Sequence, residues 1–348
     1  MNFFEFDLGL AARRLVNDIL DVKKNEAVVI TADTGSSEEV VNATAREVFT
    51  VGAKPMVIWL PSPRGVGKMA DDMLPQQPLS AALLATDVWI EFNKQWLLYS
   101  TPFDLAIEQN KKLRYVCLVE MNPDMMVRTI GRVDIPLLEK FLNEIAALTE
   151  KAKEVRVTTP AGTELKFKNH PERSLIIHSG IVPPGTYEML PGQISWTPDL
   201  DTVEGRLVFD GSLVPPVGLL ENPIILTIKS GIITAIDGKR EARQFEKWLA
   251  GFNDHKMYQL AHISYGFNPG ARLTGNIVED ERVWGATEWG IGNIGPRLVP
   301  DIPGGVKAPS HCDGICLNSS VWLDRQQIIE QGRIVNNQKL LELEQELT

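Results

Sequence analysis

One short segment near the C-terminus, residues 308–317, carries residue types that could bind a metal. It places His311 and Asp313 two residues apart, and in an extended strand residues i and i+2 point to the same face of a sheet. An imidazole and a carboxylate would then project side by side, which is a common way to hold a divalent cation. By itself the pair is a weak signal, because most His-x-Asp pairs are polar surface residues.

A second imidazole is available in residues 261–275, where His262 precedes a segment rich in Gly, Pro and Asn. Glycine in such segments lets the backbone approach a ligand closely. Together, His262, His311 and Asp313 would make two imidazoles and one carboxylate, which is the facial triad of non-haem Fe(II) oxygenases. The sequence therefore predicts a metal site formed by these three side chains.

Composition excludes several classes of function. The chain has 348 residues, of which 44% are apolar and 23% charged, which is ordinary for a globular protein and long enough for two domains. Its formal net charge of −10 argues against nucleic-acid binding. Neither a signal peptide in residues 1–7 nor a membrane span of ~20 apolar residues is recognisable. Since three cysteines form no disulfide framework, we expect a soluble, cytoplasmic protein.

Strand and helix patterns alternate through residues 1–153. Apolar residues at helical spacing predict helices, and short continuous apolar runs predict strands that are buried on both faces. The expected helices are residues 6–22, 36–51, 79–85, 101–110 and 135–155, and the expected strands are 27–31, 54–60, 87–91 and 114–119. Strands joined by helices are usually parallel. We therefore predict an N-terminal α/β domain with a doubly wound parallel sheet, of Rossmann or flavodoxin type, without a nucleotide-binding glycine motif.

Residues 154–348 show a different pattern. Alternating apolar and polar residues in 155–159 and 164–168, with a Pro-Ala-Gly turn between them, predict a β-hairpin. Further strands are expected at 205–210, 224–229 and 231–236, and helices at 241–250 and 340–347. The second domain is thus predicted to be a mostly antiparallel α+β domain that carries the metal site.

From about residue 155 onward the sequence resembles the aminopeptidase T, or thermophilic metallopeptidase, family. The resembling segments are 191–198, 205–210, 262–281 and 311–314. The peptidases of that family are similar to one another in a two-metal site of Glu, His and a His-x-Asp-like pair. This chain instead has Gln193 and His262 at the two Glu positions and Glu288 at a His position. A neutral Gln cannot supply an anionic bridge between two cations, so a single metal is favoured.

In its metal triad the chain looks most like the 2,5-dihydroxypyridine 5,6-dioxygenases, a one-iron branch of the same family. This resemblance implies that Fe(2+) is bound by His262, His311 and Asp313. It also implies a mononuclear non-haem Fe(II) dioxygenase that cleaves a hydroxylated (N-hetero)aromatic ring, such as 2,5-dihydroxypyridine, with O2 as the other substrate. Two departures put the substrate in question: Glu288 does not match those enzymes, and residues 97–100 lack their substrate-side His.

Three further residues are candidates for catalysis. Glu288 could be a fourth ligand, a general base, a proton shuttle or the ion-pair partner of a nearby arginine. Tyr265 lies three residues beyond His262 and could face the pocket or pack in the core. Tyr99 could transfer a proton only if the N-terminal domain closes over the metal.

The alternative function is that of a metal-dependent, aminopeptidase-like hydrolase. In that case Zn(2+), Mn(2+) or Co(2+) would lower the pKa of a bound water to about 7, and Glu288 would be the base. In either case the expected partner is a small molecule, an aromatic compound together with O2 for the dioxygenase, and not a nucleic acid or a membrane. We also expect a homodimer or a higher homo-oligomer.

Overall fold

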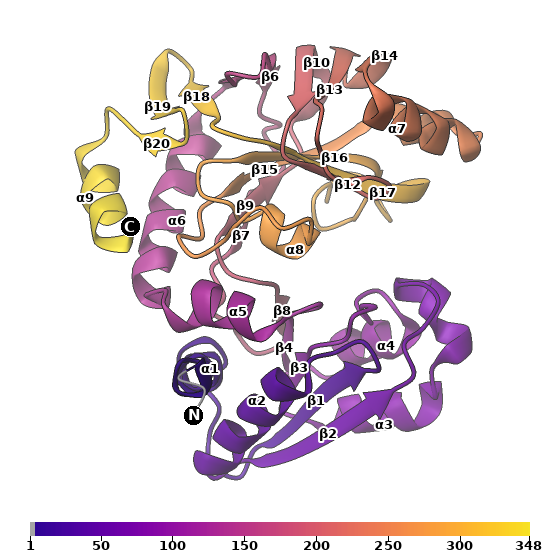
Figure 1. The fold of residues 1–348 in the computed structure, drawn as a ribbon, viewed down its shortest axis with the longest axis vertical. Helices are drawn as coiled ribbons and strands as arrows, with labels where there is room; N and C mark the ends of the chain where they lie inside the picture. The colour runs from indigo at the N-terminus through magenta and orange to yellow at the C-terminus, as the bar shows by residue number, and fades with distance from the viewer. Residues whose placement is uncertain (1–3) are drawn as a thin grey trace. The chain divides into compact units, whose positions relative to one another are not determined.

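The computed structural model describes residues 4–348, so the expected absence of a signal peptide rests in part on residues outside this range. The chain forms two compact units (Figure 1). The first contains Met1–Glu139 and His178–Pro191, and the second contains Lys140–Ile177 and Gly192–Thr348. Within residues 4–348, no helix combines the length and the apolar character that crossing a bilayer requires.

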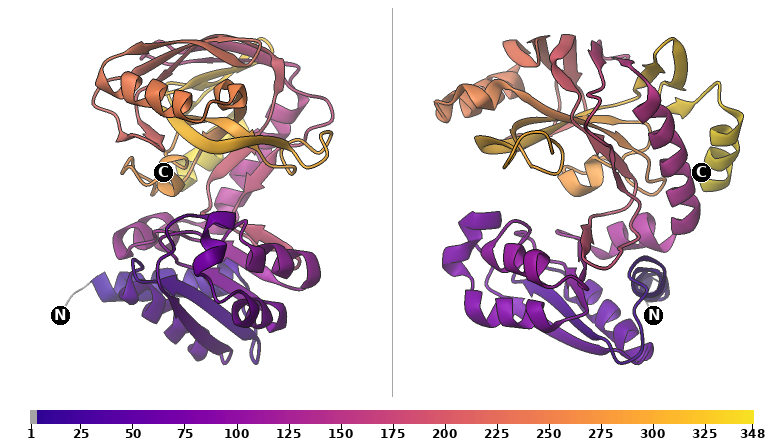
Figure 2. Two further views of the ribbon diagram at one scale, coloured as in Figure 1. Left: turned by 90° about the vertical axis from the view of Figure 1, so that its right-hand side faces the viewer. Right: turned by 180° about the vertical axis from the view of Figure 1, so that it is seen from behind.

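A five-stranded parallel sheet forms the centre of the first unit. Its strand order is β2-β1-β3-β4-β8, and all four neighbouring pairs are parallel. The strands are β1 (Ala27–Asp33), β2 (Lys54–Leu60), β3 (Val88–Glu91), β4 (Arg114–Cys117) and β8 (Thr186–Glu188). Helices lie on both faces of this sheet (Figure 2): α1 (Phe4–Arg14), α2 (Glu38–Thr50), α3 (Gln76–Ala85), α4 (Thr101–Gln109) and the short α5 (Pro123–Met126). The predicted doubly wound parallel sheet is confirmed.

The helix ends in this unit follow the expected capping chemistry. The Ser37 hydroxyl accepts a hydrogen bond from the Val40 N–H at 3.5 Å and caps α2. The first helix differs from the expected 6–22, because α1 ends at Arg14 and the chain continues as a π-helical turn over Leu15–Ile19. The apolar period alone does not distinguish these two helix types.

Buried polar groups hold the loop after β3, which carries Tyr99. Glu91 at the end of β3 is fully buried and accepts hydrogen bonds from the Tyr115 hydroxyl and the Leu97 N–H. Burial raises the pKa of Glu91 to about 7, although both hydrogen bonds favour its charged form. The hydrogen bond from Leu97 therefore anchors the loop that carries Tyr99 to the end of β3.

Two sheets built mostly from antiparallel pairs form the second unit. One has the order β14-β13-β10-β6-β5-β18-β19-β20, and the other has the order β12-β11-β17-β16-β15-β9-β7. The first sheet contains β5 (Glu154–Thr158), β6 (Glu164–Lys168), β10 (Asp199–Phe209), β13 (Ile224–Lys229), β14 (Ile232–Gly238), β18 (Ser320–Leu323), β19 (Gln326–Glu330) and β20 (Arg333–Ile334). The second contains β7 (Ile176–His178), β9 (Gln193–Trp196), β11 (Ser212–Val214), β12 (Gly218–Leu219), β15 (Leu260–Gly266), β16 (Thr287–Ile294) and β17 (Val306–Cys316). The predicted antiparallel domain is confirmed.

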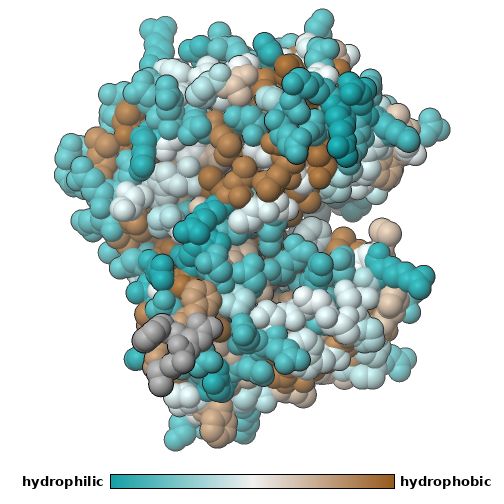
Figure 3. Space-filling model, viewed as in Figure 1, coloured by the Kyte–Doolittle hydropathy of each residue, from teal (hydrophilic) through white to brown (hydrophobic). Residues whose placement is uncertain are grey.

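Aromatic side chains fill the core of this unit. Phe167 of β6 and Trp289 of β16 meet edge to face, with 5.5 Å between ring centroids. A Cβ on Gly314 of β17 would lie 2.4 Å from the ring of Phe209, so a glycine is required where this ring crosses the strand. Polar residues cover most of the surface seen in Figure 3, and apolar residues form scattered groups on it.

Three helices complete the second unit at its periphery: α7 (Arg240–Gly251), the short α8 (Ile277–Asp280) and α9 (Gln338–Leu347). A fourth, α6 (Ile135–Lys151), was expected to close the first domain. Instead, Phe141 on α6 packs against Phe267 and Trp284, with ring centroids 5.0 and 5.1 Å apart. The division into units thus differs from the expected boundary at 153/154, because the apolar face of α6 is buried in the second unit and β8 joins the first.

Candidate metal centre

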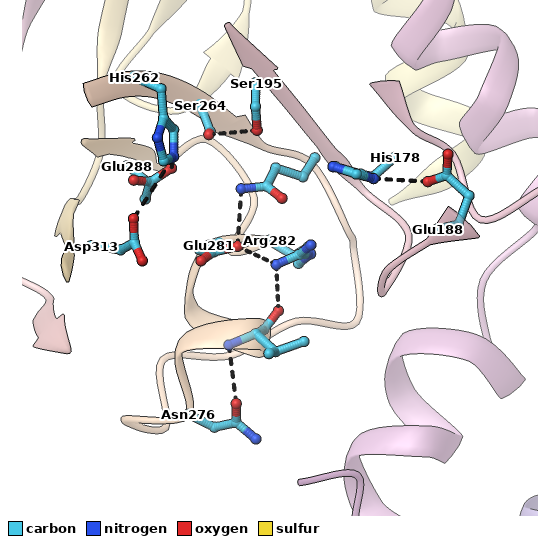
Figure 4. Close-up of polar contacts among 12 residues, drawn as sticks. His178, Glu188, Ser195, His262, Ser264, Asn276, Glu281, Arg282, Glu288 and Asp313 are labelled. Carbon is cyan, nitrogen blue, oxygen red and sulfur yellow. Dashed lines mark hydrogen bonds and ion pairs between the residues drawn. The ribbon is translucent and has the colours of Figure 1, made fainter. Parts of the chain in front are cut away.

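Three adjacent strands bring the predicted triad to one face of a sheet. His262 of β15 is paired with Gly290 of β16, and Gly290 is paired in turn with Asp313 of β17. His311, two residues before Asp313, is paired with Gly292. Paired residues and residues two apart in a strand share a face. The side chains of His262, His311 and Asp313 therefore project together, although they come from distant parts of the sequence. Figure 4 shows His262 and Asp313 directed toward one another.

The donor atoms of the triad are close enough to share one small cation. One donor atom from each of His262, His311 and Asp313 lies within 4.8 Å of the others. Asp313 Oδ1 is 2.8 Å from His311 Nε2 and 3.8 Å from His262 Nε2. The two imidazole rings are nearly parallel, at 6° with 5.3 Å between their centroids. Two nitrogens and one carboxylate oxygen suit a divalent transition metal.

The space between the two imidazoles is kept open by Gly290. A Cβ at this position would lie 2.4 Å from both Nδ1 and Cε1 of His262 and 2.9 Å from Cε1 of His311. Any side chain would therefore push the rings apart. The glycine-rich segment 290–296 signals close approach of the backbone to a ligand, but the sequence does not show that Gly290 lies between the two histidines.

The protonation of His311 is fixed by the backbone. Its Nδ1 lies 2.7 Å from the carbonyl oxygen of Asn293, and this nitrogen must donate because a carbonyl can only accept. Nε2, on the other side of the ring, lies 2.8 Å from Asp313 Oδ1 and faces the cluster, where a bound metal would take the place of its proton. The Nδ1 of His262 is buried and has no hydrogen-bond partner within residues 4–348. An unpartnered buried nitrogen beside a second imidazole that faces a carboxylate fits a site for a metal.

Two carboxyl groups near the imidazoles have opposite electrostatic environments. Burial would raise the pKa of Asp313, but the charge and hydrogen bond of His311 outweigh it and hold that pKa below its ordinary value. Burial, followed by the negative charges of Asp313 and Glu281, raises the pKa of Glu288 well above its ordinary value. Glu288 Oε2 lies 3.1 Å from His262 Nε2. The surroundings of Asp313 thus favour its anionic form, and those of Glu288 favour its protonated form beside His262.

A second group of polar side chains lies beside the triad and centres on Glu281, which the sequence analysis did not single out. Gln193 Nε2 donates a hydrogen bond to Glu281 Oε2 at 3.0 Å, and Arg282 forms an ion pair with the same oxygen. In Figure 4, Glu281 lies between Arg282 and Asp313. Gln193 stands where the resembling two-metal peptidases have a glutamate ligand. Here its amide group is hydrogen-bonded to the carboxylate of Glu281.

Of the other two candidate residues, Tyr265 belongs to the same strand as His262 but does not face the triad. Tyr265 occupies the opposite face of β15, and its ring packs against Trp196 and Phe267 at centroid distances of 4.8 and 5.9 Å. Of the two placements left open for Tyr265, the structure shows packing in the core, because an odd spacing from His262 reverses the direction of a side chain in a strand. Tyr99 belongs to the first unit and is 54% exposed, so its catalytic role stays a prediction.

The cysteines that flank Asp313 are directed away from the site. Cys312 is paired with Ile291 and Cys316 with Thr287, and both thiols are buried. Because each is an odd number of residues from Asp313, they face the core. The ligand set thus contains no thiolate from β17.

Two solved structures share this fold. One is the 2,5-dihydroxypyridine dioxygenase from Pseudomonas putida KT2440, with a TM-score of 0.78 and 21% identity, covering 97% of this chain and 99% of that one. The other is AmpT from Thermus thermophilus, with a TM-score of 0.70 and 15% identity, covering 96% of this chain and 100% of that one. These likenesses confirm the fold that the sequence predicts.

Sequence comparison assigns the family. The 2,5-dihydroxypyridine 5,6-dioxygenase of P. putida KT2440 is 23% identical over 336 residues, which is 90% of this chain and 92% of the relative. The sequence model of the family described as 2,5-dihydroxypyridine 5,6-dioxygenase matches residues 13–336. This match spans both units and includes every residue of the triad. The chain therefore belongs to the 2,5-dihydroxypyridine 5,6-dioxygenase family.

Proposed function

We propose that this dioxygenase is a mononuclear non-haem Fe(II) enzyme that opens the ring of a hydroxylated N-heteroaromatic such as 2,5-dihydroxypyridine. The observation that carries the proposal is the cluster of two imidazoles and a single anionic carboxylate on one sheet face. This donor set is typical of Fe(II) oxygenases that keep positions open for substrates. Membership of the family supports the substrate class.

In this proposal, His262, His311 and Asp313 hold the iron. When bound, the iron supplies open positions for the ring hydroxylate and O2 and exchanges electrons between them. The protein's part is to orient these groups. The carbonyl of Asn293 fixes the ring of His311, and Glu288 holds a proton beside His262 Nε2. Glu288 is 1% exposed, so this proton can move to or from a substrate atom without competition from bulk water.

The alternative, a two-metal aminopeptidase-like hydrolase, has less support from the site. Two cations held close together need an anionic bridge, and Gln193 is neutral and donates to Glu281. Glu288, at the position of a peptidase histidine, is hydrogen-bonded to His262 and has a raised pKa. A neutral carboxyl group is a poor metal ligand and a poor base for activating water. We therefore favour the one-iron reading.

Oxygen consumption tests this proposal directly. The protein, loaded with Fe(II) under anaerobic conditions, is mixed with a panel of hydroxypyridines and catechols, and dissolved O2 and ring absorbance are followed. We expect one O2 to be consumed per ring opened, with 2,5-dihydroxypyridine or a close relative as the best substrate. Hydrolysis of an aminoacyl anilide under anaerobic conditions, with no O2 uptake on any ring, would instead establish the hydrolase.

The Glu288→Gln variant tests the role of the buried carboxyl group. Glutamine keeps the shape and can still hydrogen-bond His262, but it cannot transfer a proton. We expect iron content within about twofold of wild type and turnover lower by about 10–100-fold, the usual cost of changing an outer-shell partner. The control is Glu330→Gln on the exposed part of β19, which should change neither. Loss of iron from Glu288→Gln would show that Glu288 is itself a ligand.

A further inference from the structure

Strand β2 has the composition of a covered strand but lies at the edge of its sheet (Figure 1). Its sequence is Lys-Pro-Met-Val-Ile-Trp-Leu, and strands this apolar are normally covered on both faces. Here Met56, Val57 and Trp59 are 46%, 36% and 44% exposed. Edge strands that face water are usually protected by charges, by proline or by a short length, whereas β2 has seven residues and carries such residues, Lys54 and Pro55, only at its start. The edge therefore has the character of a surface that another polypeptide covers.

The backbone groups that face outward are set by the pairing with β1. The Lys54 N–H donates to the Glu26 carbonyl at 2.8 Å, and the Leu60 carbonyl accepts from the Thr34 N–H at 3.1 Å. Alternate residues direct their backbone groups to the same side. Those of Pro55, Val57 and Trp59 consequently point to the free edge, where no strand within residues 4–348 pairs with them. The position of Pro55 agrees with this, because proline lacks an N–H and is tolerated on the open side of an edge strand.

We propose that a second copy of this chain covers this edge, with the two β2 strands antiparallel about a two-fold axis at Val57. In this register Val57 exchanges both of its backbone hydrogen bonds with Val57 of the partner subunit. The N–H of Trp59 donates to the carbonyl of Pro55 of the partner subunit, and the reverse pair forms by symmetry. Every outward N–H of β2 then has an acceptor. Lys54 stands opposite an uncharged leucine, so no like charges meet.

The same register gives the partner's tryptophan a place to pack. A groove of about 810 Å³ runs beside the start of β2 and is lined by Ala45, Phe49 and Pro55, among others. Phe49 is 74% exposed. Directly opposed residues share a face of a sheet, so Trp59 of the partner subunit lies beside Pro55 at the border of this groove. The second copy thus supplies a strand that pairs with the edge of β2 and a tryptophan that packs near the exposed ring of Phe49.

A disulfide that forms only in this register tests the proposal. Met56 would stand opposite Ile58 of the partner subunit in a non-hydrogen-bonded pair, where Cα atoms are about 4.5 Å apart, within the range of a disulfide. We expect the double variant Met56→Cys/Ile58→Cys to form a covalent dimer on mild oxidation, seen on a non-reducing gel. All three native cysteines are buried, so the wild-type chain should stay uncrosslinked. The reduced double variant should retain wild-type oxygen consumption.

The single variants are matched controls. Met56→Cys alone would have its counterpart two residues away on the opposed strand, about 7–8 Å distant, beyond the reach of a disulfide. Neither Met56→Cys nor Ile58→Cys should crosslink alone, whereas a mixture of the two chains should. Equal crosslinking of the single variants would overturn the register. Absence of crosslinking in the folded, active double variant would overturn the interface.

A change of side chain at the same edge should alter the assembly state. We expect Trp59→Glu to weaken self-association at least tenfold and to halve the mass measured by light scattering at micromolar concentration. The control is Met69→Glu, which places the same charge at a residue that is 76% exposed in the same unit but outside β2. A monomeric wild-type chain, or equal effects of the two substitutions, would contradict the proposal.

Discussion

Replacing Asp313 with Asn is expected to remove the metal from the protein and to abolish turnover. The substitution keeps the shape of the side chain but removes the only carboxylate of the cluster whose pKa lies below its ordinary value. The cation is then faced by a neutral amide and two neutral imidazoles, and none of these three groups offsets the positive charge of the cation. The loss of activity should exceed the about 10–100-fold that changes in outer-shell partners produce.

The measurement is metal content per chain after anaerobic loading with Fe(II), followed by oxygen uptake on the preferred ring substrate. Asp237→Asn, at an exposed position of β14, is the control and should bind one iron as the wild type does. His311→Ala should behave like Asp313→Asn, because it removes the nitrogen that the Asn293 carbonyl holds in place. Full iron content in Asp313→Asn would remove this residue from the ligand set.

Gly290→Ala, which adds a single methyl group, is expected to have the second large effect, on both metal binding and stability. The added methyl group would lie 2.4 Å from the His262 ring and 2.9 Å from the His311 ring. Since β16 is paired on both sides, the backbone has little freedom to retreat, and the rings must separate. We expect loss of metal binding together with a lower free energy of unfolding for the metal-free protein, by about 1–3 kcal/mol, as is typical of overpacking.

Two measurements separate these effects: iron content, and urea unfolding of the metal-free protein. Gly295→Ala is the matched control, because a Cβ there meets nothing within 4 Å. It should retain both iron and stability. If Gly290→Ala bound iron as well as Gly295→Ala, the imidazole spacing seen here would not be the spacing that the metal requires.

Local sequence patterns predicted most of the fold and part of the site. The expected strand at 54–60 coincides with β2, and Ser37, one of the two serines at the expected start of the helix 36–51, is the observed cap. The pair His311 and Asp313 was recognisable because its geometry depends only on neighbours two residues apart in one strand. His262 was predicted as a ligand from its glycine-rich context and from the resemblance to the dioxygenase family. No pattern in the sequence determines its distance from β17.

What the sequence did not predict depends on pairing between distant segments. Gly290 matters because β16 lies between β15 and β17, and the order of strands in a sheet is not written in any one of them. Glu281 and its contact with Gln193 join residues 88 positions apart. Strand β8 has only three residues, too few for a recognisable alternation. The two placements left open for Tyr265 could be distinguished from the sequence, since in a strand the odd spacing from His262 already excludes a shared face.

The spacing of the triad along β16 and β17 also determines how the gene can change in length. The connection between these strands, from Gly295 to Gly305, lies outside their register, so codons added there leave the cluster untouched. A residue inserted in β17 before His311 can be accommodated by a longer turn, which leaves His311 and Asp313 in register. A residue inserted between His311 and Asp313 makes their side chains point to opposite faces of the sheet. After a slip of one residue along β17, Cys312 would take a ligand's place on the face of the triad. The triad thus depends on the two-residue alternation of side chains along β17, so we expect insertions and deletions only in the turns.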